Sequence, residues 1–110
     1  MSLNIYLIDP TATYETEWLY EGNITHNLTK MADEVGIYEA LWRPERIGIY
    51  AKDIVEIIEE GLAHLKTRPD YFRQFNSSNG WGMYEDFVPF VEKYLIALKE
   101  YPEAKIEVSR

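Results

Sequence analysis

The sequence predicts an α+β domain in which helices pack on one face of a small sheet. Short segments that alternate apolar and polar residues lie near both ends of the chain, as expected for strands. Between them, apolar residues recur every three or four positions, as on the buried face of a helix. The 110 residues are close to the commonest size of one domain, and no repeat or linker divides them. We therefore expect residues 1–110 to form a single α+β domain.

Two N-terminal strands and one C-terminal strand are expected to form a three-stranded antiparallel or mixed sheet. Their predicted ranges are Leu3–Asp9, Thr13–Gly22 and Ala104–Val108. Pro10 ends the first strand because proline cannot donate to a ladder, and the short gap to the second predicts a hairpin. The second strand is expected to bury one face and expose an acidic one. The expected buried residues are Thr16, Trp18 and Tyr20, and the expected acidic ones are Glu15, Glu17 and Glu21.

Three main helices are expected on one face of this sheet, each with an apolar stripe. They cover Asn27–Val35, Ala51–Lys66 and Tyr84–Glu100. Gly36 is expected to end the first helix in the left-handed conformation. Pro89 falls inside the third helix, where we expect it to be tolerated near the start. Shorter helical turns are expected at Ile37–Trp42 and Tyr71–Phe75, and a loop is expected at Asn76–Gly82.

The composition limits the possible functions. Nineteen acidic and 11 basic residues give a net charge of -8, which argues against binding to a nucleic-acid backbone. The charge fits either a solvated surface or an acidic face that meets a basic partner or imitates nucleic acid. Without cysteine, disulfides, thiolate metal sites and cysteine nucleophiles are excluded. The N-terminus does not resemble a signal peptide, and no apolar run approaches a membrane span. We therefore expect a cytoplasmic protein with no membrane contact.

The polar segment Asn23–Asn27 is the first candidate site. It joins the second strand to the first helix and contains Asn23, Thr25, His26 and Asn27. One interpretation is structural, because Thr25 or an asparagine is a good N-cap for the helix. The other is a ligand site, because free N–H groups at a helix N-terminus suit an anion or a carbonyl oxygen.

Two aromatic segments offer further candidates. In Asn79–Gly82, two glycines flank Trp81, which either plugs the core or forms a stacking lid over a ligand beside Tyr84. Trp42 and Arg43 either end a helix with the indole buried or present a cation–π surface to a partner protein.

The sequence contains no motif for a metal or a cofactor. His26 and His64 lie far apart, and no His-x-x-x-His pair, EF-hand spacing, GxGxxG or Walker motif is present. One histidine without a paired acid or nucleophile does not justify a catalytic assignment. We therefore expect no cofactor and no metal, and we favour a function other than catalysis.

The segment Asn23–Leu41 (NITHNLTKMADEVGIYEAL), followed by Trp42-Arg43-Pro44, resembles a family of small bacterial and phage-encoded proteins. In that family, an N-I-T-[HY]-N segment follows a tryptophan-containing strand. The N-G-W-G loop at Asn79–Gly82 and the ending Ile106–Arg110 fit the resemblance as well. The family has no established activity, so the resemblance implies an origin without a mechanism.

Three hypotheses of function follow. The first is a small acidic, non-enzymatic binding protein, related to phages or prophages, that acts on a protein partner. The second is a small-molecule or enzymatic site in which Asn23, His26 and Asn27 converge with Trp81 and Tyr84 on a cleft. The third is an acidic nucleic-acid mimic. The oligomeric state is left open.

Overall fold

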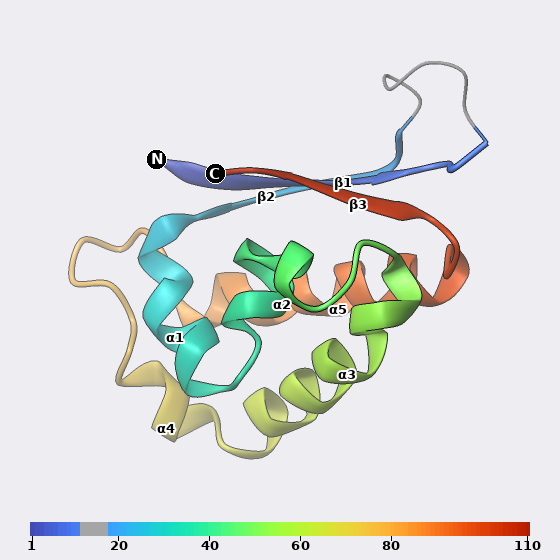
Figure 1. Ribbon diagram of the computed structural model, residues 1–110. Helices are drawn as coiled ribbons and strands as arrows, with labels where there is room; N and C mark the ends of the chain where they lie inside the picture. The colour runs from blue at the N-terminus through green and yellow to red at the C-terminus, as the bar shows by residue number, and fades with distance from the viewer. Residues whose placement is uncertain (12–17) are drawn as a thin grey trace.

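The computed structural model describes residues 1–11 and 18–110, and in them a three-stranded antiparallel sheet carries helices on one face (Figure 1). The strands are β1 (Ser2–Ile8), β2 (Trp18–Thr25) and β3 (Lys105–Ser109). The α-helices are α1 (Thr29–Glu34), α2 (Tyr38–Trp42), α3 (Ala51–Thr67), α4 (Pro69–Arg73) and α5 (Tyr84–Glu100). Two 3₁₀ turns are η1 (His26–Leu28) and η2 (Pro44–Arg46). The predicted α+β class, with helices covering one side of the sheet, is confirmed.

The N-terminal strand β1 lies in the middle of the sheet, in the order β2-β1-β3. Its odd-numbered residues Leu3, Ile5 and Leu7 face the helices and are fully buried. The register places Ile24 of β2 opposite Leu3 and Ile106 of β3 opposite Leu7, so these side chains share the buried face. The predicted pairing of the C-terminal strand with the N-terminal pair is confirmed.

The predicted face of Trp18 is wrong. The pairing between β1 and β2 shifts between Leu7 and Ile8, so that Tyr20 lies opposite Leu7 but Trp18 lies opposite Ile8. This irregularity moves Trp18 to the outer face of the sheet, where its ring lies 4.5 Å from that of Tyr6 between centroids, tilted by 32°. The sequence pattern predicted Trp18 and Tyr20 on one face because strict alternation assumes that no extra residue is inserted into the strand.

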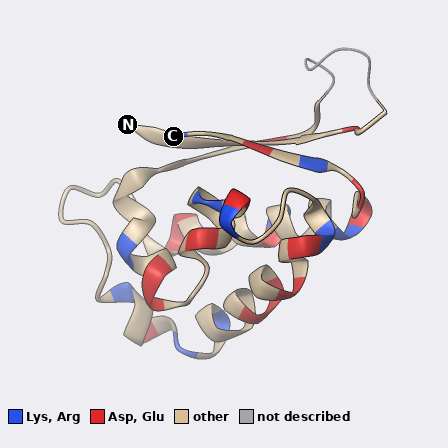
Figure 2. Cartoon of the chain, in the orientation of Figure 1, with Lys and Arg blue, Asp and Glu red and all other residues tan. Residues whose placement is uncertain are grey.

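The outer face of the sheet is less acidic than the sequence predicts. In the described residues, two carboxylates, Glu21 and Glu107, flank Tyr6 from the two neighbouring strands, and Lys105 lies on the same face. Glu15 and Glu17, which the prediction also placed there, lie outside the described residues. Figure 2 shows Lys and Arg interspersed with Asp and Glu along the helices.

The first helix covers His26 to Glu34, as η1 followed directly by α1, and so begins and ends one residue earlier than predicted. Gly36 follows the C-cap residue Val35, and its φ of 85° is the left-handed conformation that was predicted for it and that glycine adopts most readily. Ile37 N donates to Ala32 O at 2.9 Å and returns the chain towards α2.

The two longest helices, α3 and α5, pack against each other below the sheet (Figure 1). The predicted stripes are confirmed, since Ile54, Ile58 and Leu65 of α3 are buried, as are Phe87 and Leu98 of α5. Pro89 is tolerated inside α5, as predicted. The short turn after α3 begins earlier than predicted, at Pro69, because proline suits the first turn of a helix. No helix in residues 1–11 and 18–110 has the length and apolar character of a membrane span.

One buried hydroxyl in this core has no partner. Tyr94 of α5 is fully buried and stacks on Tyr20 of β2 at 5.6 Å between ring centroids. Its hydroxyl finds no hydrogen bond among the described residues. Burial, with a smaller contribution from Tyr20, raises the pKa of the Tyr94 phenol well above its ordinary value.

We expect Tyr94→Phe to increase the free energy of unfolding by about 1 kcal/mol at neutral pH, because an unpaired buried hydroxyl is removed. Above about pH 10 an unfolded tyrosine loses its proton while the buried one keeps it. The stability of the wild type therefore falls with pH there, by up to about 1.4 kcal/mol per unit from this group. Urea unfolding of both proteins at pH 7 and pH 11 measures the difference. An advantage of the variant that shrinks at pH 11 would contradict this assignment.

Candidate functional site

An open cleft of about 1140 Å³ runs along the free side of β2. Its walls are β2 and η1 on one side, and the loop at 79–82 and the first half of α5 on the other. The residues that line it include Glu21, Gly22, Asn23, Trp81, Asp86 and Phe90.

The cleft brings together most of the residues that the sequence singled out. Asn23, Thr25, His26, Asn27 and Trp81 all line it. The polar segment and the tryptophan loop therefore meet beside the start of the first helix, which is part of the arrangement that the second hypothesis expects. Tyr84, Trp42 and Arg43 are not among the lining residues.

Within the polar segment, Thr25 caps the helix and Asn27 fastens the loop. Thr25 Oγ1 accepts a hydrogen bond from Asn27 N at 3.2 Å, which is the predicted capping role. Asn27 Nδ2 donates to Trp81 O at 2.8 Å. Asn23 lies on the outer face of the sheet, where its Nδ2 donates to Ser2 Oγ and Asn4 Oδ1 at 2.9 and 2.8 Å. The amide side chains are therefore already engaged within the protein.

The partly buried His26 connects the cleft to the core. Its Nδ1 accepts a hydrogen bond of 2.9 Å from Trp42 Nε1, so the ring proton of the neutral imidazole lies on Nε2. Trp42 is only 2% exposed and stacks on Tyr38 at 5.6 Å and 10°. The alternative in which Trp42 and Arg43 present a cation–π surface is therefore wrong for the indole, which is enclosed by its neighbours. The structural interpretation of Trp42 is confirmed.

Trp81 does not plug the core, which corrects the structural interpretation of its loop. Its side chain is 72% exposed at the rim of the cleft. The loop reaches this position because Gly82 has a φ of 105° and lies so close to η1 that an added Cβ would be 2.9 Å from Asn27 Cβ. Asn79 Oδ1 accepts a hydrogen bond from Trp81 N at 2.9 Å and holds the turn.

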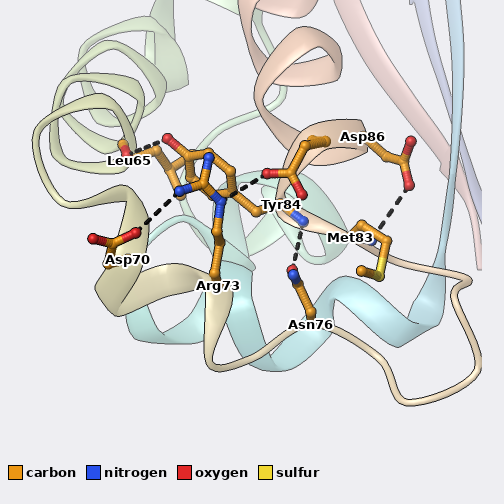
Figure 3. A network of polar contacts seen from close by, with 8 residues as sticks. Leu65, Asp70, Arg73, Asn76, Met83, Tyr84 and Asp86 are labelled. Carbon is orange, nitrogen blue, oxygen red and sulfur yellow. Dashed lines mark hydrogen bonds and ion pairs between the residues drawn. The ribbon is translucent and has the colours of Figure 1, made fainter.

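Tyr84 does not line the cleft. It belongs to a network of polar contacts between the start of α5, the end of α3 and the segment between them (Figure 3). Its hydroxyl donates to Leu65 O at 2.7 Å, and its backbone N donates to Asn76 Oδ1 at 2.6 Å. The guanidinium of Arg73 lies 4.8 Å from the centre of its ring and also pairs with Asp70. Proximity in sequence suggested a place beside Trp81, but the first turn of α5 points Tyr84 towards α3.

The free edge of β2 is a feature that the sequence did not reveal. Hydrogen-bonded and non-hydrogen-bonded pairs alternate along an antiparallel ladder. His26 N donates to Met1 O at 3.4 Å, so His26 and Met1 form a hydrogen-bonded pair. Every second residue of β2 before His26 is then also bonded to β1, namely Ile24, Gly22 and Tyr20. Glu21, Asn23 and Thr25 then direct their backbone N–H and C=O groups away from β1. In the described residues, the N–H and C=O of Glu21 and Asn23 and the N–H of Thr25 make no backbone bond to a loop or turn. The C=O of Thr25 is different, because Thr25 is the N-cap of η1 and its C=O accepts the first bond of that turn.

The opposite edge of the sheet is partly closed. Ile106 N of β3 donates to Ile49 O at 2.7 Å, and Ala51 N donates to Ala104 O at 2.9 Å. Tyr50 forms an isolated bridge to Lys105 between these two bonds. The segment before α3 therefore covers the start of β3, whereas β2 opens onto the cleft. An exposed edge of this kind is a template for pairing with another chain.

The lining of the cleft combines apolar surface with few charges. Phe90 and Pro89 of α5 and Trp81 supply apolar area, Glu21 and Asp86 are acidic, and Lys93 is basic. Burial raises the pKa of the Tyr20 phenol, which stays protonated. Within the described parts of the chain, no group of three His, Asp or Glu side chains is placed to hold a metal ion. The arrangement is suited to hydrogen bonding along a backbone and to apolar contact.

The sequence matches no protein-family model, and neither the curated proteins nor the solved structures give a significant match. The resemblance to bacterial and phage-encoded proteins therefore stays a prediction.

Proposed function

We propose that the protein is a non-enzymatic binding module that takes up an extended segment of a partner protein along the free edge of β2. The observation that carries this proposal is a row of backbone groups that the register turns away from β1 and towards an open cleft. They are the N–H and C=O of Glu21 and Asn23 and the N–H of Thr25. A partner strand would complete these hydrogen bonds and add a fourth strand to the sheet.

The walls of the cleft fit an extended chain. In a strand, every second side chain points to the same face, so a partner paired with β2 would direct alternate side chains into the cleft. There Phe90 and the exposed Trp81 offer the aromatic contacts that often dominate binding energy. Backbone hydrogen bonds would supply affinity for any extended chain, and the contacts of its side chains with the cleft would supply selectivity.

The alternative of a small-molecule or enzymatic site has less support. It needs polar groups that converge on a ligand. Asn27 Nδ2, Asn23 Nδ2 and His26 Nδ1 are instead engaged within the protein. The alternative of a nucleic-acid mimic needs one continuous acidic face. In the described residues, lysines and arginines instead lie among the carboxylates and form ion pairs with them (Figure 2).

We place the partner in a bacterial cell or one of its phages. The resemblance implies a phage- or prophage-related origin, and the partner would then be a host or phage protein. A cytoplasmic location fits the sequence composition.

Asn23→Pro tests the proposal at one backbone N–H. The Asn23 N–H points to the open edge, so proline there removes no bond to β1 but blocks the added strand. The probes are two acetylated eight-residue peptides, one alternating valine with lysine and one alternating valine with glutamate. We expect calorimetry to detect binding of at least one peptide. Asn23→Pro should bind that peptide at least about tenfold more weakly than Asn23→Ala, which lacks the same amide but keeps the N–H.

Amide hydrogen exchange provides a second readout and a check of folding. In the free protein, the amides of Gly22 and Ile24 should exchange slowly and those of Glu21, Asn23 and Thr25 quickly. Bound peptide should slow the second group. If neither peptide binds, or if Asn23→Pro and Asn23→Ala bind equally well, the proposed function is wrong.

A further inference from the structure

We infer that the segment bound along β2 is a basic strand, with a lysine or arginine beside Glu21 on the outer face and an apolar side chain beside Gly22 on the inner face. This inference rests on the proposed function and adds the chemistry of the partner to it.

The outer face supplies the preference for a basic residue. Glu21 lies opposite Tyr6 of β1, on the solvent side of the sheet, and its side chain is exposed. It forms no ion pair with a described residue. An added strand would place one side chain directly beside it, about 5 Å away between Cβ atoms. Opposite charges at such a cross-strand position are favourable, and like charges are unfavourable.

The inner face supplies the preference for an apolar residue. Gly22 has no side chain, and the position where a Cβ would stand is 3.1 Å from Phe90 Cε2. Phe90 therefore approaches the strand closely at this point, and together with Pro89 it forms the floor of the cleft. A partner residue paired with Gly22 would point towards this floor, where an apolar side chain removes aromatic surface from water.

The direction in which α5 runs along β2 determines where Asp86 and Lys93 lie in the cleft. Tyr94 stacks on Tyr20 and Phe90 lies beside Gly22, so α5 runs antiparallel to β2. Asp86 is about one helical turn before Phe90, towards the end of the cleft at Thr25, and Lys93 is about one turn after it. The inner wall thus favours a basic side chain only near Asp86, while the outer face favours one beside Glu21.

The charge of the whole chain acts in the same direction. A net charge of -8 creates a field that speeds the approach of a cationic segment and slows that of an anionic one. This long-range effect weakens as salt increases, whereas a contact with Glu21 depends on position. The two contributions can therefore be separated by comparing carboxylates at different places on the same face.

Glu21→Lys and Glu107→Lys form a matched pair for this test. Both glutamates flank Tyr6 on the outer face and both variants change the net charge equally, but Glu21 lies at the open edge and Glu107 lies on β3. We expect the wild type to bind the valine–lysine peptide at least about tenfold more tightly than the valine–glutamate peptide. Glu21→Lys should remove or reverse this preference, and Glu107→Lys should change it less than threefold.

A block isomer of the peptide, with four lysines followed by four valines, shows whether alternation matters at equal charge. It should bind at least about tenfold more weakly than the alternating peptide. If the glutamate peptide binds as well as the lysine peptide, or if both charge variants shift the preference equally, the inferred partner chemistry is wrong. These outcomes do not contradict the proposed function. That function is contradicted only if no peptide binds, or if Asn23→Pro binds a peptide as tightly as Asn23→Ala does.

Discussion

Trp42→Ala is expected to lower the free energy of unfolding by about 3–5 kcal/mol, the range observed when a large buried aromatic side chain is truncated. Trp42 is 2% exposed and belongs to the core cluster that the sheet and helices share. Since a domain of this size is stable by roughly 5–15 kcal/mol, this one change removes a large part of the total.

Two kinds of interaction contribute to this expected loss. Truncation removes the stacking of the indole on Tyr38 and leaves a cavity that the surrounding helices fill only in part. It also removes the hydrogen bond from Trp42 Nε1 to His26 Nδ1. Because His26 is the first residue of η1, we expect loss of this bond to loosen the start of η1 as well.

Trp81→Ala is the matched control, because it deletes the same side chain from an exposed position. We expect it to change stability by less than about 0.5 kcal/mol. Trp42→Phe keeps an aromatic ring but not the N–H, and it isolates the contribution of the hydrogen bond. Urea unfolding followed by circular dichroism measures all three variants. Equal losses for Trp42→Ala and Trp81→Ala would contradict the placement of the two indoles.

The secondary structure of this chain is largely encoded in local patterns. The spacing of Ile54, Ile58 and Leu65 predicts α3, and the position of Gly36 predicts the end of the first helix, because both depend on residues close in sequence. The strand faces were less accessible. One inserted residue in β2 rotates Trp18 to the other face, and alternation alone contains no sign of it.

The candidate site was predictable in part. The sequence indicated that the segment at Asn23–Asn27 and the loop at Asn79–Gly82 were the places to search, and the fold brings them to one cleft. It did not decide whether Trp81 plugs the core or stays exposed, because that depends on how close the loop lies to η1. It also did not indicate that Tyr84 points to α3, because that depends on how α5 packs on α3. The free edge of β2 follows from the strand order, which depends on contacts between the two ends of the chain.

Gly61 in the middle of α3 provides a second test of the packing. We expect its replacement by alanine to destabilise the protein, although helix propensity alone favours alanine. Alanine in a helix interior is normally more stable than glycine by about 1 kcal/mol. At Gly61, however, an added Cβ would overlap Cγ2 of Ile37, the residue that follows the turn between α1 and α2. Because both residues are buried, the overlap forces the helices apart. We expect Gly61→Ala to destabilise the protein by about 1–3 kcal/mol.

A double-mutant cycle with Ile37→Ala separates the two effects. Ile37→Ala alone should cost about 2–5 kcal/mol, because it empties a fully packed position. It also removes the methyl group that meets the new Cβ, so that Gly61→Ala in this background should gain about 1 kcal/mol from helix propensity. Urea unfolding of the four proteins measures the change of sign. A loss of similar size in both backgrounds would show that the cost at Gly61 does not arise from Ile37, and the close approach of α3 to the turn between α1 and α2 would be wrong.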